Sequence, residues 1–288
     1  MLINLVQATI MGLLTGMVYG LMALGLSVIF GVMRVVNFAH GEMMVVGMYL
    51  AWLLFEHAGI DPLLAVPLVA AALFVAGYGL QRGLINPFIN VAEHMQFMLL
   101  LAVSIIIVNL CLLIAGPDTY GVQVDYMFDS YALGPFTFDA VRVYAALAAL
   151  AIAGLLFLFF TRTRIGKSIR AAADNHTGAL VVGLDVPRLY ALTFGVGAAC
   201  VGAAGALMIL VVQAQPFLAI DYTLLAFVIV IVGGLGSMPG ALAGGLLIGV
   251  SESLAGLLIQ PSLKSVFSFG LLILVLLLRP QGLFARRG

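Results

Sequence analysis

The sequence predicts an all-α fold, a polytopic membrane helix bundle of about 8–9 transmembrane helices, and three observations support this. Of the 288 residues, 64% are hydrophobic and 8% are charged, whereas a soluble domain is about 45–50% apolar and about 25% charged. The apolar stretches approach the ~20 residues that a helix needs to cross a hydrocarbon core. They also lack the alternation that is typical of strands in outer-membrane barrels.

Hydropathy locates the individual helices. The predicted spans are approximately residues 3–31, 41–57, 62–82, 95–115, 142–161, 189–213, 222–236, 240–259 and 263–279. The first stretch has no Lys or Arg before its apolar run, so we interpret it as a span and not as a signal peptide. The stretch from Gly233 to Ala241 separates either two full spans or the halves of one broken element.

The distribution of charge predicts the orientation. Ten of the twelve Lys and Arg residues fall on one side of these spans: Arg34, Arg82, Arg162, Arg164, Lys167, Arg170, Arg188, Arg279, Arg286 and Arg287. The opposite side carries Arg142 and Lys264 with seven acidic residues, namely Glu56, Asp61, Asp118, Asp125, Asp129, Asp139 and Asp221. Because basic residues favour the cytoplasmic side, we expect the N-terminus outside, the C-terminus in the cytoplasm, and about nine crossings.

The connecting segments are short. The largest outer segment, residues 116–141, contains Gly-Pro pairs and aromatic residues that indicate a compact cap. The largest inner segment is residues 162–188, and the sequence has no Gly-rich Walker motif. We therefore expect residues 1–288 to form a single transmembrane domain that has no nucleotide site of its own. A net charge of zero argues against a nucleic acid partner.

Small residues recur every fourth position in several spans, as in Gly12, Gly16 and Gly20. This spacing puts them on one helix face, where helices can pack closely or slide during transport. Cys111 and Cys200 lie in separate spans, and we interpret them as buried hydrophobic residues and not as a disulfide or a metal pair.

The stretch "GVMRVVNFAHGEMMVVG" places Asn37, His40 and Glu42 between two apolar runs. One interpretation is a short polar turn in which Asn37 caps the next helix. The other is a break buried in the bundle, where the three side chains face a water-filled pathway, since irregular backbone at membrane depth needs such shielding. A metal site is not expected, because further ligands are missing nearby, and no catalytic residue is predicted.

Glu252 lies well inside an apolar span, between Ser251 and Ser253. A carboxyl group in hydrocarbon is unfavourable, so we expect it to face the bundle interior with a partner. Glu252 is either a second pathway residue or a structural residue that forms a hydrogen bond to a neighbouring helix.

The inner segment 162–188 either sets topology through its basic residues or docks on a cytoplasmic partner through a short helix from Arg170 to Ala179. Its length and helix-forming centre favour docking. The apolar contacts expected there come from Ile169, Ala172, Leu180 and Val181. We predict that Arg170 and Asp174 set the orientation, and that Gly178 and Gly183 permit close approach or a turn.

Four motifs together resemble a known family. "GLLTGMVYGLMALGLSVIFGVMRVVNFAHGE" is similar to the opening of LivH-type permeases of branched-chain amino acid ABC transporters, and "GKSIRAAADNHTGALVVGLDV" resembles their ATPase-coupling loop. "GGLGSMPGALAGGLLIGVSESL" and "LLRPQGLF" are similar to the last third. The loop departs from the family in reading "AAADNHTGAL", without the acidic Glu-Ala-Ala form of many importers.

The resemblance implies a multi-pass protein of a prokaryotic inner membrane that imports branched-chain or related amino acids and is not itself an enzyme. It implies four partners: a second, LivM-like permease, two ATP-binding subunits that hold ATP and Mg²⁺, and a periplasmic substrate-binding protein. Alternatives are a permease for another small polar solute, such as an amide, urea or a sugar, or a self-powered secondary transporter. The latter needs a coupling-ion site near the midplane, for which only Glu252 qualifies.

Overall fold

The computed structural model describes residues 1–89, 91, 93–260 and 264–284. Arg286, Arg287 and the first residue of the predicted span 263–279 lie outside the described residues. The long helices are α1 (Leu2–Met33), α2 (His40–Ala58), α3 (Pro62–Leu80), α4 (Glu93–Ala115), α5 (Ala140–Arg162), α8 (Val186–Met208), α9 (Leu218–Gly233), α10 (Met238–Leu258) and α11 (Lys264–Leu278). The short elements are η1 (Gln81–Ile85), η2 (Asn86–Phe88), η3 (Asp125–Phe128), β1 (Ser130–Leu133), β2 (Phe136–Asp139), α6 (Arg164–Asp174) and α7 (His176–Val181).

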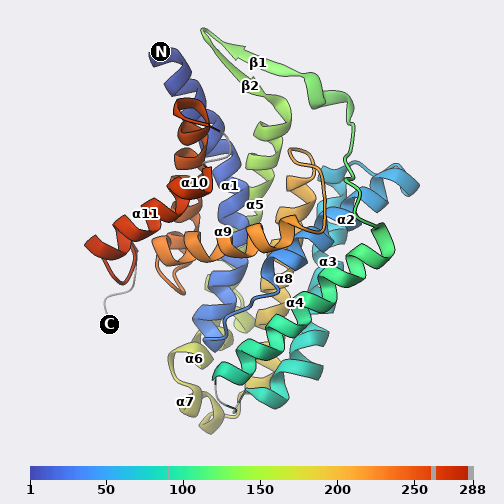
Figure 1. Cartoon of the computed structure of the whole chain (residues 1–288). Coiled ribbons are helices and arrows are strands. Elements are labelled where there is room, and N and C mark those ends of the chain that lie inside the picture. Colours follow the sequence, from blue (N-terminus) through green and yellow to red (C-terminus); the bar gives the residue numbers. More distant parts are fainter. Residues whose placement is uncertain (90, 92, 261–263, 285–288) are drawn as a thin grey trace.

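The predicted all-α bundle is confirmed, and a helix occupies each predicted span in the described part of the chain. Six helices there are long and apolar enough to cross a membrane, namely α1, α3, α4, α5, α8 and α10, while α9 and α11 are shorter apolar helices. The stretch from Gly233 to Ala241 separates two helices, because α9 ends at Gly233 and α10 begins at Met238. In Figure 1, α9 lies roughly horizontally, whereas α1 and α10 run roughly from top to bottom.

Glycines set the spacing between α1 and α10. A Cβ built on Gly16 would lie 2.8 Å from the carbonyl oxygen of Gly245, and a Cβ on Gly12 would lie 2.7 Å from that of Gly249. Such distances are well inside van der Waals contact, so the two backbones touch directly. The four-residue spacing predicted for the first span is therefore a helix-packing surface.

Helix α8 packs in the core against α2 and α3. Gly47 of α2 faces Gly202 of α8, with a would-be Cβ 2.7 Å from the Gly202 carbonyl oxygen. Both cysteines are free thiols, Cys200 buried in α8 and Cys111 partly buried in α4. They form no disulfide, as expected from their positions in separate spans.

The outer segment folds into a cap at the end of the bundle opposite to α6 and α7 (Figure 1). Strands β1 and β2 form an antiparallel hairpin in which Tyr131 pairs with Phe138. Tyr126 donates its hydroxyl hydrogen to the carboxylate of Asp61, 2.9 Å from each oxygen. The pKa of Tyr126 is raised, mainly by burial of the hydroxyl and also by this hydrogen bond. The bond fastens the cap to the start of α3, which Asp61 also caps by accepting from the Leu63 N–H.

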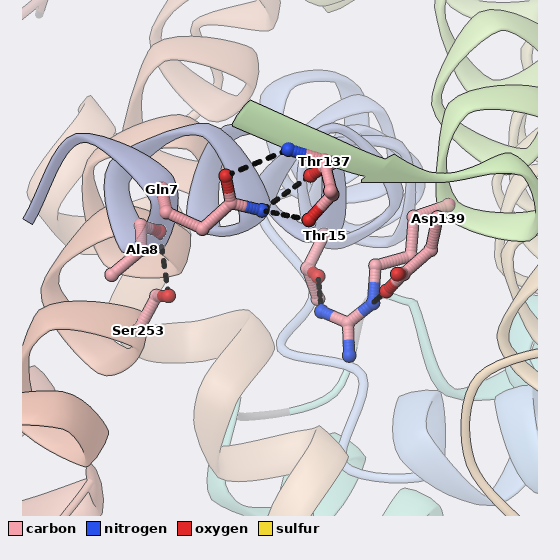
Figure 2. A network of polar contacts seen from close by, with 7 residues as sticks. Gln7, Ala8, Thr15, Thr137, Asp139 and Ser253 are labelled. Carbon is pink, nitrogen blue, oxygen red and sulfur yellow. Dashed lines mark hydrogen bonds and ion pairs between the residues drawn. The ribbon is translucent and has the colours of Figure 1, made fainter. Parts of the chain in front are cut away.

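A second set of polar contacts joins the hairpin to α1 (Figure 2). The amide of Gln7 exchanges hydrogen bonds with the backbone of Thr137. Arg142 donates to the hydroxyl of Thr15 at 3.2 Å and forms an ion pair with Asp139 at 3.1 Å. These contacts hold the predicted outer end of α1 against the cap.

Candidate functional site

The connection between α1 and α2, residues 34–39, re-enters the bundle. Helix α1 ends at Met33, and Arg34 reverses the chain with a left-handed φ of 56°. His40, the first residue of α2, bonds the carbonyl oxygen of Met22 through Nε2 at 2.9 Å. Met22 precedes the end of α1 by about 16 Å at 1.5 Å per residue. Helix α2 therefore begins deep in the bundle, and the segment is a buried break and not a surface turn.

The three polar side chains predicted here are all buried. Asn37 and His40 are fully buried, and Glu42 is 3% exposed. Asn37 accepts the N–H of Ala39 at 3.1 Å and lies 3.9 Å from the sulfur of Met43. The amide of Asn37 thus holds the turn before α2 through local contacts.

His40 and Glu42 face different neighbours. The His40 ring reaches α1 at the Met22 carbonyl, whereas the Glu42 carboxylate reaches α4 and α9. Ser104 Oγ of α4 lies 2.5 Å from Glu42 Oε1, and Thr223 Oγ1 of α9 lies 3.0 Å from Glu42 Oε2. The break therefore brings Asn37, His40 and Glu42 into the bundle without directing them at one common space.

Gly41 brings α9 against the first turn of α2. Its N–H donates to Thr223 Oγ1 at 2.9 Å. A Cβ at this position would collide with the carbonyl oxygen of Ala219 and with the backbone nitrogen of Thr223. Only a glycine allows this approach.

Three aromatic rings pack together near the start of α2, one from the connection before it and one each from α4 and α9. The Phe38 ring packs edge-on against Phe97 of α4, with centroids 4.6 Å apart, and in a tilted arrangement against Phe227 of α9, with centroids 5.0 Å apart. The carbonyl oxygen of Phe38 is 3.5 Å from Thr223 Oγ1. Phe38, Phe97 and Phe227 are called the aromatic cover below.

Sequence reasoning missed Ser104 and Thr223, the two partners of Glu42. Hydroxyl residues in membrane helices often bond a carbonyl of their own helix, as Thr193 does with Leu189 in α8. A lone Ser or Thr in an apolar span therefore gives little indication of a long-range partner.

Glu252 lies in a separate place, where α10 meets α11. Ser268 Oγ of α11 donates to Glu252 Oε1 at 2.9 Å, and Tyr19 of α1 also interacts with the carboxylate. The neighbouring Ser253 donates to the carbonyl oxygen of Ala8 at 2.6 Å (Figure 2). Glu252 is thus partly buried among three helices, α1, α10 and α11.

We expect Glu252→Gln to keep the fold, since the amide oxygen can still accept from Ser268. Glu252→Leu leaves that hydroxyl without its partner and should lower the free energy of unfolding by about 1–2 kcal/mol. The measurement is the apparent melting temperature in detergent, with solute import measured in parallel. If Glu252→Leu imports solute at the wild-type rate, Glu252 has no role in the pathway.

The segment 162–188 folds into two short helices instead of one. Thr163 caps α6 by accepting the Gly166 N–H at 3.0 Å, and Asn175 caps α7 by accepting the Gly178 N–H at 2.8 Å. The predicted helix from Arg170 to Ala179 is therefore wrong, because the extended backbone of Asn175 interrupts it.

The side chains of this segment divide between the bundle and the surface. Ile169 and Ala172, expected to contact a partner, are buried within this chain. Leu180, Val181 and Val182 project from the tip and are 50%, 82% and 75% exposed. We call these three residues the apolar tip.

The predicted coupling residues lie on α6, on α7 and in the turn that follows α7. Arg170 and Asp174 are exposed on α6, and Gly178 lies partly buried in α7. Gly183 turns the chain after α7 with a φ of 81°, a conformation that glycine adopts readily. The segment thus presents an exposed, capped helical surface at one end of the bundle.

A multi-pass helical bundle with buried polar groups at a broken helix, and an exposed helical segment at one end, defines a membrane transport subunit. The chain belongs to the family described as the permease component of branched-chain amino acid transport systems, whose sequence profile matches residues 8–276.

Individual relatives agree with this assignment. The chain is 32% identical to the high-affinity branched-chain amino acid transport system permease protein LivH of Escherichia coli K12, over 96% of this chain and 94% of the relative. It is 29% identical to BraD of Pseudomonas aeruginosa, over 97% and 95%. A probable permease protein of Methanocaldococcus jannaschii, LivM, is 26% identical over 79% and 71%.

Proposed function

We propose that this chain is one of two permease subunits of an ATP-driven importer that moves branched-chain or related amino acids into the cytoplasm. The similarity to LivH and BraD carries the proposal, because it extends over nearly the whole chain. Residues 1–288 form a single permease domain in the inner membrane of a prokaryote, paired with a LivM-like permease. A periplasmic binding protein delivers the solute.

Energy enters through the segment 162–188. The apolar tip supports this role, because three exposed aliphatic side chains, in the same segment as the exposed Arg170, suit a cleft in another protein. Two partner subunits bind ATP and Mg²⁺ and hydrolyse the nucleotide, and this chain carries no cofactor. Arg170 and Asp174 orient the contact, while Gly178 and Gly183 keep it close.

The solute passes beside the re-entrant segment. Asn37, His40 and Glu42 are pathway residues, of which Glu42 has the position best suited to contact solute, between α4 and α9. Glu252 is a further candidate, where α10 meets α11. His40 and Asn37 contribute to the pathway by holding the start of α2 deep in the bundle.

The test is solute uptake into liposomes that contain the complete complex with its binding protein. We expect labelled leucine, isoleucine or valine to accumulate when ATP is enclosed, and not when a non-hydrolysable analogue replaces it. Uptake driven by a proton or sodium gradient without ATP would support a secondary transporter. Uptake of only urea, acetamide or a sugar would contradict the amino acid assignment.

A further inference from the structure

The hydrogen bonds around Glu42 suit a carboxylate anion. Thr223 Oγ1 accepts the Gly41 N–H at 2.9 Å, so its own hydrogen is free to be donated to Glu42 Oε2 at 3.0 Å. The 2.5 Å contact from Ser104 Oγ to Oε1 lies at the short end of the range for a hydroxyl bonded to a charged oxygen. Glu42 therefore accepts two hydrogen bonds.

The negative charge of Glu42 is only partly balanced within this chain. Glu42 lies in the first turn of α2, where a helix N-terminus supplies roughly half a positive charge. Among the described residues, the ion pair found joins Arg142 to Asp139, and none involves Glu42. His40, two residues away, is directed to Met22. A buried carboxylate without a cation is unfavourable, so a positively charged group arriving here would be stabilised.

The aromatic cover joins α4 and α9, the same two helices that bond Glu42 through Ser104 and Thr223. Phe97 is 38% exposed, whereas Ser104 and Glu42 are 8% and 3% exposed. Phe97 and Ser104 are two turns apart on α4, and therefore on the same face. A displacement of α4 would separate the Phe97 ring from Phe38 and the Ser104 hydroxyl from Glu42 together. Aromatic faces also attract cations, so the opened site would combine a carboxylate with three rings.

We propose that Glu42 is the counter-charge for the ammonium group of the transported solute, and that Phe38, Phe97 and Phe227 line its approach. The inference rests on the proposed function in amino acid import and makes it more specific. It assigns to the permease itself a preference for solutes that carry a protonated amine over neutral amides, urea and sugars.

The experiment compares Glu42→Gln with wild type in liposomes that contain the complete complex and its binding protein, with labelled leucine as the probe. Glutamine has the same shape, and its amide can bond both hydroxyls, so only the charge is lost. We expect leucine import to fall at least about tenfold, as when one partner of a buried charge pair is removed. The apparent melting temperature and the assembly of the complex should stay unchanged.

Two further variants serve as controls. Glu56→Gln removes a charge from an exposed position of the same helix and should import leucine normally. Ser104→Ala removes one hydrogen bond but keeps the charge, and should lower import by only about two- to threefold.

Each other result contradicts the inference in a distinguishable way. If wild type imports leucine and Glu42→Gln does so at the same rate, the counter-charge role is wrong while the proposed function stands. If the variant also loses complex assembly and basal ATP hydrolysis, Glu42 is a structural residue and the inference is wrong. If wild type imports urea, acetamide or a sugar but no amino acid, both proposals are wrong.

Discussion

Gly41→Ala will destabilise the centre of the bundle and abolish transport. The added methyl group would collide with the carbonyl oxygen of Ala219 and the backbone nitrogen of Thr223. Backbone atoms of two packed helices cannot move apart without breaking the Gly41 to Thr223 hydrogen bond. We expect the free energy of unfolding to fall by about 3 kcal/mol, measured as a lower apparent melting temperature and a smaller fraction of monodisperse protein in detergent.

Gly154→Ala is the matched control for this change. Gly154 lies inside α5, and a Cβ there would meet nothing within 4 Å. Alanine favours a helix over glycine, by up to about 1 kcal/mol in an exposed helix interior, so this variant should melt at or above the wild-type temperature. Equal melting temperatures for the two variants would show that α9 does not approach α2 as closely as described.

Val181→Asp will uncouple ATP hydrolysis from import. Val181 is 82% exposed, so the change leaves the packing of this chain intact. If the apolar tip docks in a cleft of an ATP-binding subunit as we propose, the carboxylate would be buried there at a cost of several kcal/mol. We expect the amount of leucine imported per ATP hydrolysed to fall at least about tenfold, while the protein still reaches the membrane.

Val181→Thr separates charge from shape in this test. Threonine keeps the branched outline of valine and adds one hydroxyl, so most of the coupling should remain. If Val181→Asp binds the ATP-binding subunits and imports at the wild-type rate, the segment 162–188 serves only as a topology signal.

The sequence predicted the positions of the helices well, because apolar length is a local property that each span carries by itself. It also located the break at Asn37, His40 and Glu42, since polar residues between apolar runs are conspicuous. Their surroundings could not be predicted. Ser104 and Thr223 meet Glu42 from helices far apart in the chain, and no local pattern specifies that meeting.

The segment 162–188 likewise has features that the sequence predicted and features that it did not. Its helical content followed from its composition, but the interruption at Asn175 depends on a side chain that bonds the Gly178 N–H and starts a new helix. An asparagine can equally lie on a continuous helix surface. Ile169 was expected at a partner surface, and it is buried because α6 packs against its own bundle.

The glycine contact between α1 and α10 limits how this protein can move. Two helices whose backbones touch at Gly16 and Gly245 have no side-chain layer to deform, so neither can roll or slip past the other without a clash. Helices α1 and α10 therefore form one rigid unit within the subunit. Any alternation between outward and inward access then has to come from elements fastened through side chains alone, and α4, held to Glu42 by the Ser104 hydroxyl, is such an element.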